Sequence, residues 1–341
     1  MEPETLERSP ALKTIERICF AAGLLLLAWL LYRIGPATLV SNLALLGWGF
    51  LLVVALHVLV VFFNGLSWKL LLPPDRRVSL VTLGTMIVVG DGINAVSPVG
   101  FIGGELMRAN LLRRYVPGPE AVGSVALAAM SQFVGQAVFL LTGLPVAIGR
   151  VGNESLRVVF LILSGALLAL LAFVLWIGWS RRAFAWAGKS LDRVRWLRER
   201  WQKLPERWRS LGAQTVDALR RRPGSFAGSV AAALAAWQVG VVETYLILRL
   251  VRQPVALTAA FAIEVLAVAI EGAFFFVPAK IGTQEGGKVL IFLAMGLSPA
   301  KGLALGFVRR LRALAWAAIG FVALGLYPWR GGRASASLVA R

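Results

Sequence analysis

Long uncharged stretches of apolar residues dominate the chain. Residues 121–149 and 158–180 contain no charged side chain, and residues 34–68 contain His57 as their one ionisable group. Each stretch exceeds the roughly 20 apolar residues that a helix needs to cross the hydrocarbon core of a membrane. The pattern therefore predicts long membrane helices over residues 15–34, 43–68, 119–148, 158–179, 224–250 and 300–327.

Two other apolar regions, residues 79–116 and 255–298, are interrupted by glycine, proline and charged residues. The apolar run at the start of the first region, residues 80–89, is too short to cross a membrane. Glycine and proline interrupt helices and leave backbone N–H and C=O groups without helical hydrogen-bond partners. Within a membrane, other parts of the protein or a water-filled cavity must then provide those partners. We therefore predict an all-α, polytopic transmembrane helical bundle with re-entrant or broken helices, forming a single membrane domain over residues 1–341.

The two broken regions match each other when the chain is shifted by 180 residues. Three long predicted helices separate them, and this odd number gives the second region the opposite orientation in the membrane. Inverted repeats with broken helices are a recurring plan of transporters, which bind substrate where the repeats meet. We place the first repeat at 79–148 and the second at 259–327. The matched pairs are Asp91 with Glu271, Gly92 with Gly272, Pro98 with Pro278, Glu105 with Glu285, Arg108 with Lys288, and Pro119 with Pro299.

Ionisable residues within these apolar segments indicate a path for a polar substrate, because a charge is costly inside a membrane. Glu105 and Arg108 stand three residues apart on one helical face, as do Glu285 and Lys288. Ion pairs that only hold the broken helices in place are the alternative interpretation of each pair. The candidate path residues are Asp91, Asn94, Glu105, Arg108, Glu271, Lys280, Glu285, Lys288, Arg309, Arg310 and Arg312, and the candidate hinges are Pro98, Gly104, Pro278 and Gly282.

Several polar residues fall outside the repeat pattern. Glu243 and Glu264 suit an ion pair and a substrate path equally well. His57 is expected to be a hydrogen-bonded packing residue, and Asn64 and Gln132 are expected to join neighbouring helices. With one cysteine and one histidine in the chain, the sequence predicts no disulfide, no thiolate or histidine metal site, and no bound cofactor.

The net charge of +19 is concentrated in residues 181–222, which contain thirteen Lys and Arg residues against four acidic ones. A soluble protein this basic would suggest nucleic acid, but here most of the chain is committed to lipid, so we expect no nucleic-acid partner. Leucine and tryptophan recur at helical spacing from Leu191 to Leu211, which predicts a cytoplasmic amphipathic helix on anionic lipid headgroups. A solvated connector is the alternative. The positive-inside rule then places both termini and residues 69–77 in the cytoplasm.

At these motifs the chain resembles the lysylphosphatidylglycerol synthase transmembrane-region family, also called flippase-like membrane proteins. Asn94, Pro98, Gly104, Glu105 and Arg108 carry the resemblance in the first broken region, and Pro278, Gly282, Glu285 and the run Arg309-Arg310-Leu311-Arg312 carry it in the second. The stretches PAKIGTQEGG and FVRRLRALAW look most like the branch associated with hopanoid biosynthesis. Lys280 stands where many members have a glycine-containing turn, and this departure could change the headgroup preference.

The resemblance implies lipid translocation in a bacterial inner membrane, and it implies no lysyl transfer, because the soluble transferase domain of the two-domain members is not expected here. We expect a flippase or transporter of a phospholipid or hopanoid-type lipid, with membrane lipids as partners and enzymes of lipid biosynthesis as candidate protein partners. A membrane-embedded lipid-modifying enzyme with paired carboxylates as acid and base is one alternative. A carrier for an ion or a small metabolite is the other.

Overall fold

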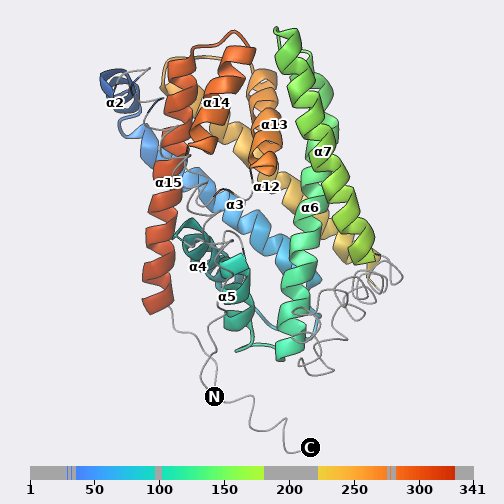
Figure 1. Cartoon of the computed structure of the whole chain (residues 1–341). Helices are drawn as coiled ribbons and strands as arrows, with labels where there is room; N and C mark the ends of the chain where they lie inside the picture. The colour runs from blue at the N-terminus through green and yellow to red at the C-terminus, as the bar shows by residue number, and fades with distance from the viewer. Residues whose placement is uncertain are drawn as a thin grey trace, which may run out of the picture.

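The computed structural model is a bundle of α-helices (Figure 1) and describes residues 29, 32, 36–96, 102–179, 222–274, 277 and 282–326. The predicted all-α helical bundle is confirmed. The helices of this described part are α2 (Pro36–Ala44), α3 (Gly49–Leu71), α4 (Leu80–Val96), α5 (Ile102–Leu112), α6 (Gly118–Ile148), α7 (Glu154–Trp179), α12 (Pro223–Leu250), α13 (Leu257–Ala273), α14 (Thr283–Ala294) and α15 (Pro299–Leu326).

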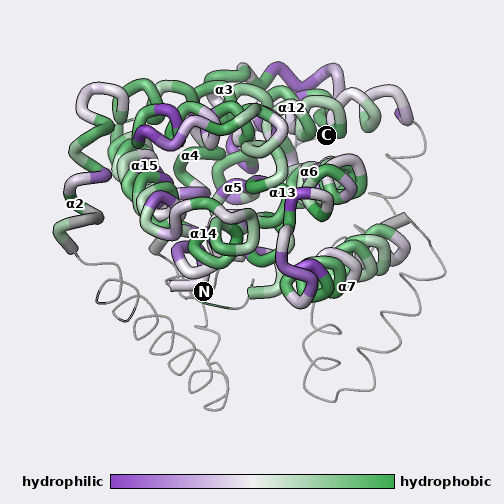
Figure 2. Tube along the Cα trace, turned by 90° about the horizontal axis from the view of Figure 1, so that it is seen from above, coloured by the Kyte–Doolittle hydropathy of each residue, from purple (hydrophilic) through white to green (hydrophobic). Residues whose placement is uncertain are grey.

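Four of the described helices are long and apolar enough to cross a membrane. They are residues 49–71 of α3, 120–148 of α6, 154–173 of α7 and 223–250 of α12. Helix α15 has 28 residues, about 42 Å at 1.5 Å per residue, but it carries three arginines near its middle. Seen along the bundle, the helices are coloured mainly as hydrophobic (Figure 2). The protein is therefore a multi-pass membrane protein.

Two pairs of short helices occupy opposite ends of the bundle (Figure 1). Helices α4 and α5 have 17 and 11 residues, and α13 and α14 have 17 and 12. None reaches the roughly 20 residues of a membrane-spanning helix. The first pair enters from and returns to the end that holds residues 72–79, and the second uses the end that holds residues 251–256. This placement is what the inverted-repeat prediction requires, and the repeat relation itself stays a prediction.

Helix α15 packs closely against both pairs. A Cβ atom added to Gly302 would lie 2.8 Å from the Lys288 carbonyl oxygen of α14. A Cβ atom added to Gly320 would lie 2.5 Å from the Val88 carbonyl oxygen of α4. Small residues permit such close approach of backbones, which is a common way for helices to associate in membranes. Helix α15 therefore joins the two pairs, with its arginines between the two contacts.

Hydrogen bonds between helices support the apolar packing. The Gln132 amide on α6 donates to Asn64 Oδ1 on α3 at 2.9 Å, as predicted. The buried hydroxyl of Ser67 lies 2.8 Å from that of Ser229 and 3.2 Å from that of Ser131. These bonds join α3, α6 and α12 away from the charged residues.

The beginning of the chain differs from the prediction. Residues 36–44 form helix α2, although no helix was predicted over residues 35–42, and the predicted helix over 43–68 begins instead at Gly49. The predicted helix over 15–34 lies outside the described residues, apart from positions 29 and 32. The predicted amphipathic segment over 181–222 also lies outside them, except for Arg222, whose guanidinium donates to the Leu72 carbonyl at 3.0 Å.

Candidate functional site

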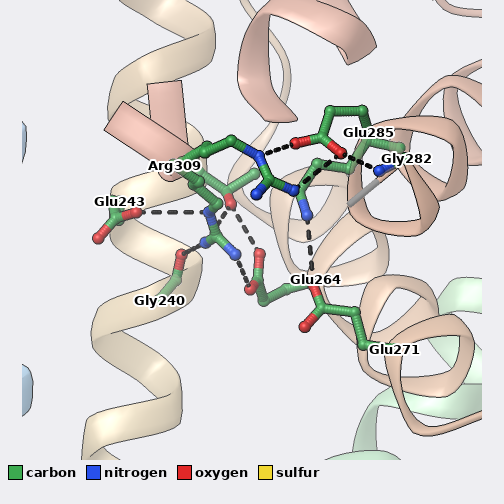
Figure 3. A network of polar contacts seen from close by, with 10 residues as sticks. Gly240, Glu243, Glu264, Glu271, Gly282, Glu285 and Arg309 are labelled. Atoms are coloured by element: carbon green, nitrogen blue, oxygen red, sulfur yellow. Dashed lines mark hydrogen bonds and ion pairs between the residues drawn. The ribbon is translucent and has the colours of Figure 1, made fainter. Parts of the chain in front are cut away.

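The larger of two charged clusters lies among α12, α13, α14 and α15 (Figure 3). It combines four carboxylates with four cationic side chains, so its formal charges balance within the described residues. We call it the C-terminal cluster. Its charged members are Glu243, Glu264, Glu271, Glu285, Lys288, Arg309, Arg310 and Arg312.

Arg309 binds groups on two other helices of this cluster. Its Nη1 lies 2.5 Å from Glu264 Oε1, and its Nη2 donates to the Gly240 carbonyl at 2.9 Å and to Thr244 Oγ1 at 2.8 Å. The Thr244 hydroxyl donates in turn to Glu264 Oε2 at 2.7 Å, and Arg309 Nε lies 3.3 Å from Glu243 Oε1. One buried guanidinium therefore connects α15 to α12 and α13, and its rigid fork of donors suits this role.

Glu285 connects the start of α14 to α15. Arg310 donates from Nε to Glu285 Oε1 and from Nη2 to Oε2, the second contact at 3.1 Å. The backbone amide of Gly282 also donates to Oε2 at 3.0 Å, so the carboxylate caps the N-terminus of the helix. Gly282 has a φ of +75°, which a glycine adopts without steric cost. The predicted hinge glycine thus lies at the turn that begins α14.

A third contact of the cluster crosses the α13–α14 pair. Lys288 Nζ on α14 lies 3.3 Å from Glu271 Oε1 on α13, and the lysine is almost completely buried. The two residues are 17 positions apart. This contact holds together two helices that are joined in sequence through residues 274–282.

Arg312 extends the cluster to α3. Its Nη1 donates to Glu243 Oε2 and also lies 3.1 Å from Nδ1 of His57. The His57 ring packs against Trp316 with ring centroids 5.3 Å apart, and the Trp316 indole donates to the Val54 carbonyl at 3.1 Å. The histidine is therefore hydrogen-bonded and packed, as predicted, but its partner is a charged member of the cluster.

The smaller cluster lies on α4 and α5, and we call it the N-terminal cluster. Arg108 Nη2 lies 2.6 Å from Asp91 Oδ1, and Arg108 Nη1 donates to Glu105 Oε1. Asn94 Oδ1 accepts a hydrogen bond from the backbone amide of Gly104 at 2.7 Å. Gly104 lies within the first turns of α5, where a Cβ atom would be 2.3 Å from a backbone oxygen of α4. Close packing of α5 against α4 therefore explains why a residue without a side chain stands at position 104.

Each cluster contains an equivalent ion pair, but the side chains of the two clusters differ in solvent exposure. Arg108 pairs with Asp91 across 17 residues, and Lys288 pairs with Glu271 across the same number. The Asp91 side chain is 49% exposed and that of Glu271 is 26% exposed. Glu105 is 30% exposed and its counterpart Glu285 is fully buried. The N-terminal cluster is thus the more open one, and it has two acids against one base.

The structure brings most of the predicted path residues into these two clusters. Pro98, Pro278 and Lys280 lie outside the described residues.

Two acidic residues whose role the sequence left open, Glu243 and Glu264, are buried members of the C-terminal cluster. Sequence reasoning missed Thr244 and the contact of His57 with Arg312. The pair Glu243-Thr244 inside an otherwise apolar helix was the available signal. The described residues contain no group of three or more His, Cys, Asp or Glu side chains that could bind a metal ion.

Residues 17–322 match the family model of the lysylphosphatidylglycerol synthase TM region. The chain belongs to this family. The predicted resemblance is thereby confirmed, and the match covers both charged clusters and the helices that carry them. No curated protein and no solved structure matches the chain. Membership of the lysylphosphatidylglycerol synthase TM-region family indicates a membrane protein with a lipid-related function.

Proposed function

We propose that this member of the family moves a phospholipid or hopanoid-type lipid between the two leaflets of a bacterial inner membrane. The observation that supports this most is the pair of charged clusters on short helices that enter the bundle from opposite ends. Carrying a polar headgroup through hydrocarbon requires polar side chains at membrane depth, and such residues are costly unless they have a role. Helix α15, which contacts both short pairs, is the element through which the clusters communicate.

The ion pairs are chemically suited to exchange a protein carboxylate for a lipid headgroup. Arginine binds phosphate and carboxylate through the same fork of N–H donors, so a lipid phosphate can compete with Glu105 for Arg108 or with Glu285 for Arg310. The released carboxylate then accepts hydrogen bonds from hydroxyl or amine groups of the same headgroup. The acyl or polycyclic part of the lipid stays in the bilayer, and no covalent bond is made or broken.

Reconstitution of the purified protein into vesicles tests this proposal. Fluorescent phosphatidylglycerol and a fluorescent hopanoid would be placed in both leaflets, and an impermeant quencher would report how fast the inner pool reaches the outer leaflet. We expect the protein to accelerate the movement of at least one of these lipids between the leaflets. The variants Arg108→Gln and Glu285→Gln should each lower this rate by about tenfold, which corresponds to about 1.4 kcal/mol in the activation free energy of lipid movement.

The matched control is Glu154→Gln, which removes a carboxylate from an exposed ion pair with Arg157 at one end of the bundle. This variant should keep the wild-type rate. Protein that accelerates no lipid would refute the proposal. A new lipid product detected by mass spectrometry would favour a lipid-modifying enzyme instead, and uptake of a water-soluble solute would favour a carrier.

A further inference from the structure

The contact between His57 and Arg312 fixes the protonation of the histidine. A guanidinium group has only donors, so the Nδ1 atom of His57, 3.1 Å from Arg312 Nη1, must accept. In this arrangement the imidazole is neutral and carries its proton on Nε2. A second proton on Nδ1 would remove the acceptor and place two cations in contact, so proton binding at His57 and the docked position of Arg312 exclude each other.

Among the described helices, those that pack most closely against α3 are α4, α6, α12 and α15, and three of them bring charged groups toward His57. Helix α15 provides Arg312 in contact and Arg309 at longer range. Helix α12 provides Glu243, which shares the same Arg312 nitrogen. Helix α4 provides Asp91, which is paired with Arg108 at 2.6 Å and interacts with Arg312 at longer range. The fourth helix, α6, has one ionisable residue, Glu120, and it is paired with Arg76 at the end of the bundle.

The charge balance of the two clusters favours a second arrangement. Among the described residues, the C-terminal cluster has four acids and four bases, whereas the N-terminal cluster has Asp91 and Glu105 against Arg108. If Arg312 moved from Glu243 toward Asp91, the N-terminal cluster would become neutral. A protonated His57 would then supply the positive charge that Glu243 lost. One proton taken from water would thus leave both clusters balanced.

We propose that His57 is a proton-binding site that couples the movement of Arg312 between the two clusters to the transport cycle. The ligand is a proton, which binds Nδ1 of the ring as the Arg312 hydrogen bond breaks. Proton release restores the contact seen in the structure. The site itself rests on the geometry around His57, and only its coupling to lipid movement rests on the proposed function.

Because His57 is the only histidine of the chain, it can be observed directly. Protein labelled with ¹⁵N-histidine, purified through a tag without histidine and placed in lipid nanodiscs, gives one imidazole to follow by NMR between about pH 8 and about pH 5. We expect a neutral ring protonated at Nε2 near pH 8 and a second proton at Nδ1 on acidification. In Arg312→Gln the second proton should bind at a pH higher by about one unit or more, because the opposing cation is gone.

The matched control is Arg157→Gln, which removes an arginine from the exposed ion pair with Glu154 outside both clusters and leaves Arg312 in place. Its histidine should behave as in the wild type. A ring protonated at Nδ1 near pH 8, a ring that stays neutral throughout the range, or equal shifts in both arginine variants would overturn the proposal. These readouts need no transport, so they remain valid if the protein moves no lipid.

Lipid movement in vesicles tests the coupling. His57→Asn keeps an acceptor near the position of Nδ1 but cannot take up a proton. A rate that one proton controls changes by up to about tenfold per pH unit, and we expect such a dependence for the wild type and a flat profile for His57→Asn. A variant that retains the wild-type pH profile would show that His57 is not the coupling site.

Discussion

Arg309 connects three helices through one buried guanidinium group, so its partners should be essential for stability. Replacing Glu264 by glutamine would leave the positive charge without its 2.5 Å carboxylate partner. Breaking a buried pair in this way costs about 3–5 kcal/mol. We therefore expect Glu264→Gln to lower the unfolding temperature of the detergent-solubilised protein clearly, as measured by temperature-dependent size-exclusion chromatography.

An exposed ion pair provides the control for this substitution. Glu154 and Arg157 lie at the end of α7, where a pair contributes at most about 1 kcal/mol. Glu154→Gln should therefore unfold at nearly the wild-type temperature. Equal effects of the two substitutions would mean that burial does not set the strength of the Arg309 network.

The sequence identified many of these charged residues but few of their partners. The three-residue spacing paired Glu105 with Arg108, and the structure contains that ion pair. The same spacing paired Glu285 with Lys288, whereas Lys288 binds Glu271 in the structure. The partners of Arg309 lie 45 and 66 residues away in sequence, on α13 and α12. No local spacing specifies such contacts, since they depend on how whole helices pack. For the same reason, the sequence could not show that Glu285 binds Arg310 on the next helix.

At the scale of helices, the contact between α4 and α15 depends on the absence of a side chain at Gly320. A Cβ atom there would meet the Val88 carbonyl oxygen at 2.5 Å, and backbone atoms cannot move aside easily. Gly320→Ala should destabilise the protein by about 1–3 kcal/mol, the usual cost of overpacking. Gly325 on the same helix has open space around it. Gly325→Ala should therefore be neutral or stabilising by up to about 1 kcal/mol. Comparing the unfolding temperatures of the two variants with that of the wild type tests both expectations.

The contact between α14 and α15 makes a different prediction, because two charges carry it. Glu285→Gln and Arg310→Gln should each destabilise the protein, and the double variant should cost less than the two single effects added. A coupling free energy of about 0.5–3 kcal/mol is typical of residues in direct contact. Denaturant unfolding of the four proteins measures it. Additive effects would show that Glu285 is held mainly by the Gly282 amide.

Helix positions were predictable where composition alone decides them. The apolar runs behind α3, α6, α7 and α12 are long enough to require spanning helices, and α15 begins one residue from its predicted start. Helix α2 was missed because Pro36 and the polar Ser41-Asn42 pair are typical of a turn. There, packing outweighs local signals: Lys301 of α15 hydrogen-bonds to Asn42 and to the Val251 carbonyl, both at 2.5 Å.

For the whole molecule, the orientation in the membrane follows from where the basic loops lie. The loops before α4 and after α5 lie at the same end of the bundle (Figure 1). The first contains Arg76 and Arg77, the second contains Arg113 and Arg114, and Arg222 hydrogen-bonds to the Leu72 carbonyl in the first loop. This loop region lies outside the spans, and a hydrogen bond to Glu120 raises the pKa of Arg76, so its charge is permanent. Positive residues favour the cytoplasmic side. We therefore propose that this end is cytoplasmic.

Cysteine labelling tests that orientation and the opposed entry of the two short helix pairs together. In a Cys19→Ser background, Asp75→Cys places a thiol in the exposed loop before α4, and Ala256→Cys places one in the exposed loop before α13. An impermeant maleimide added to intact cells should label position 256 only, and both positions should react after permeabilisation. Labelling of position 75 alone would reverse the orientation and leave the opposed entry intact. Equal labelling of both in intact cells would mean that both short pairs enter from the same side, in which case a lipid headgroup could not pass from one cluster to the other across the membrane.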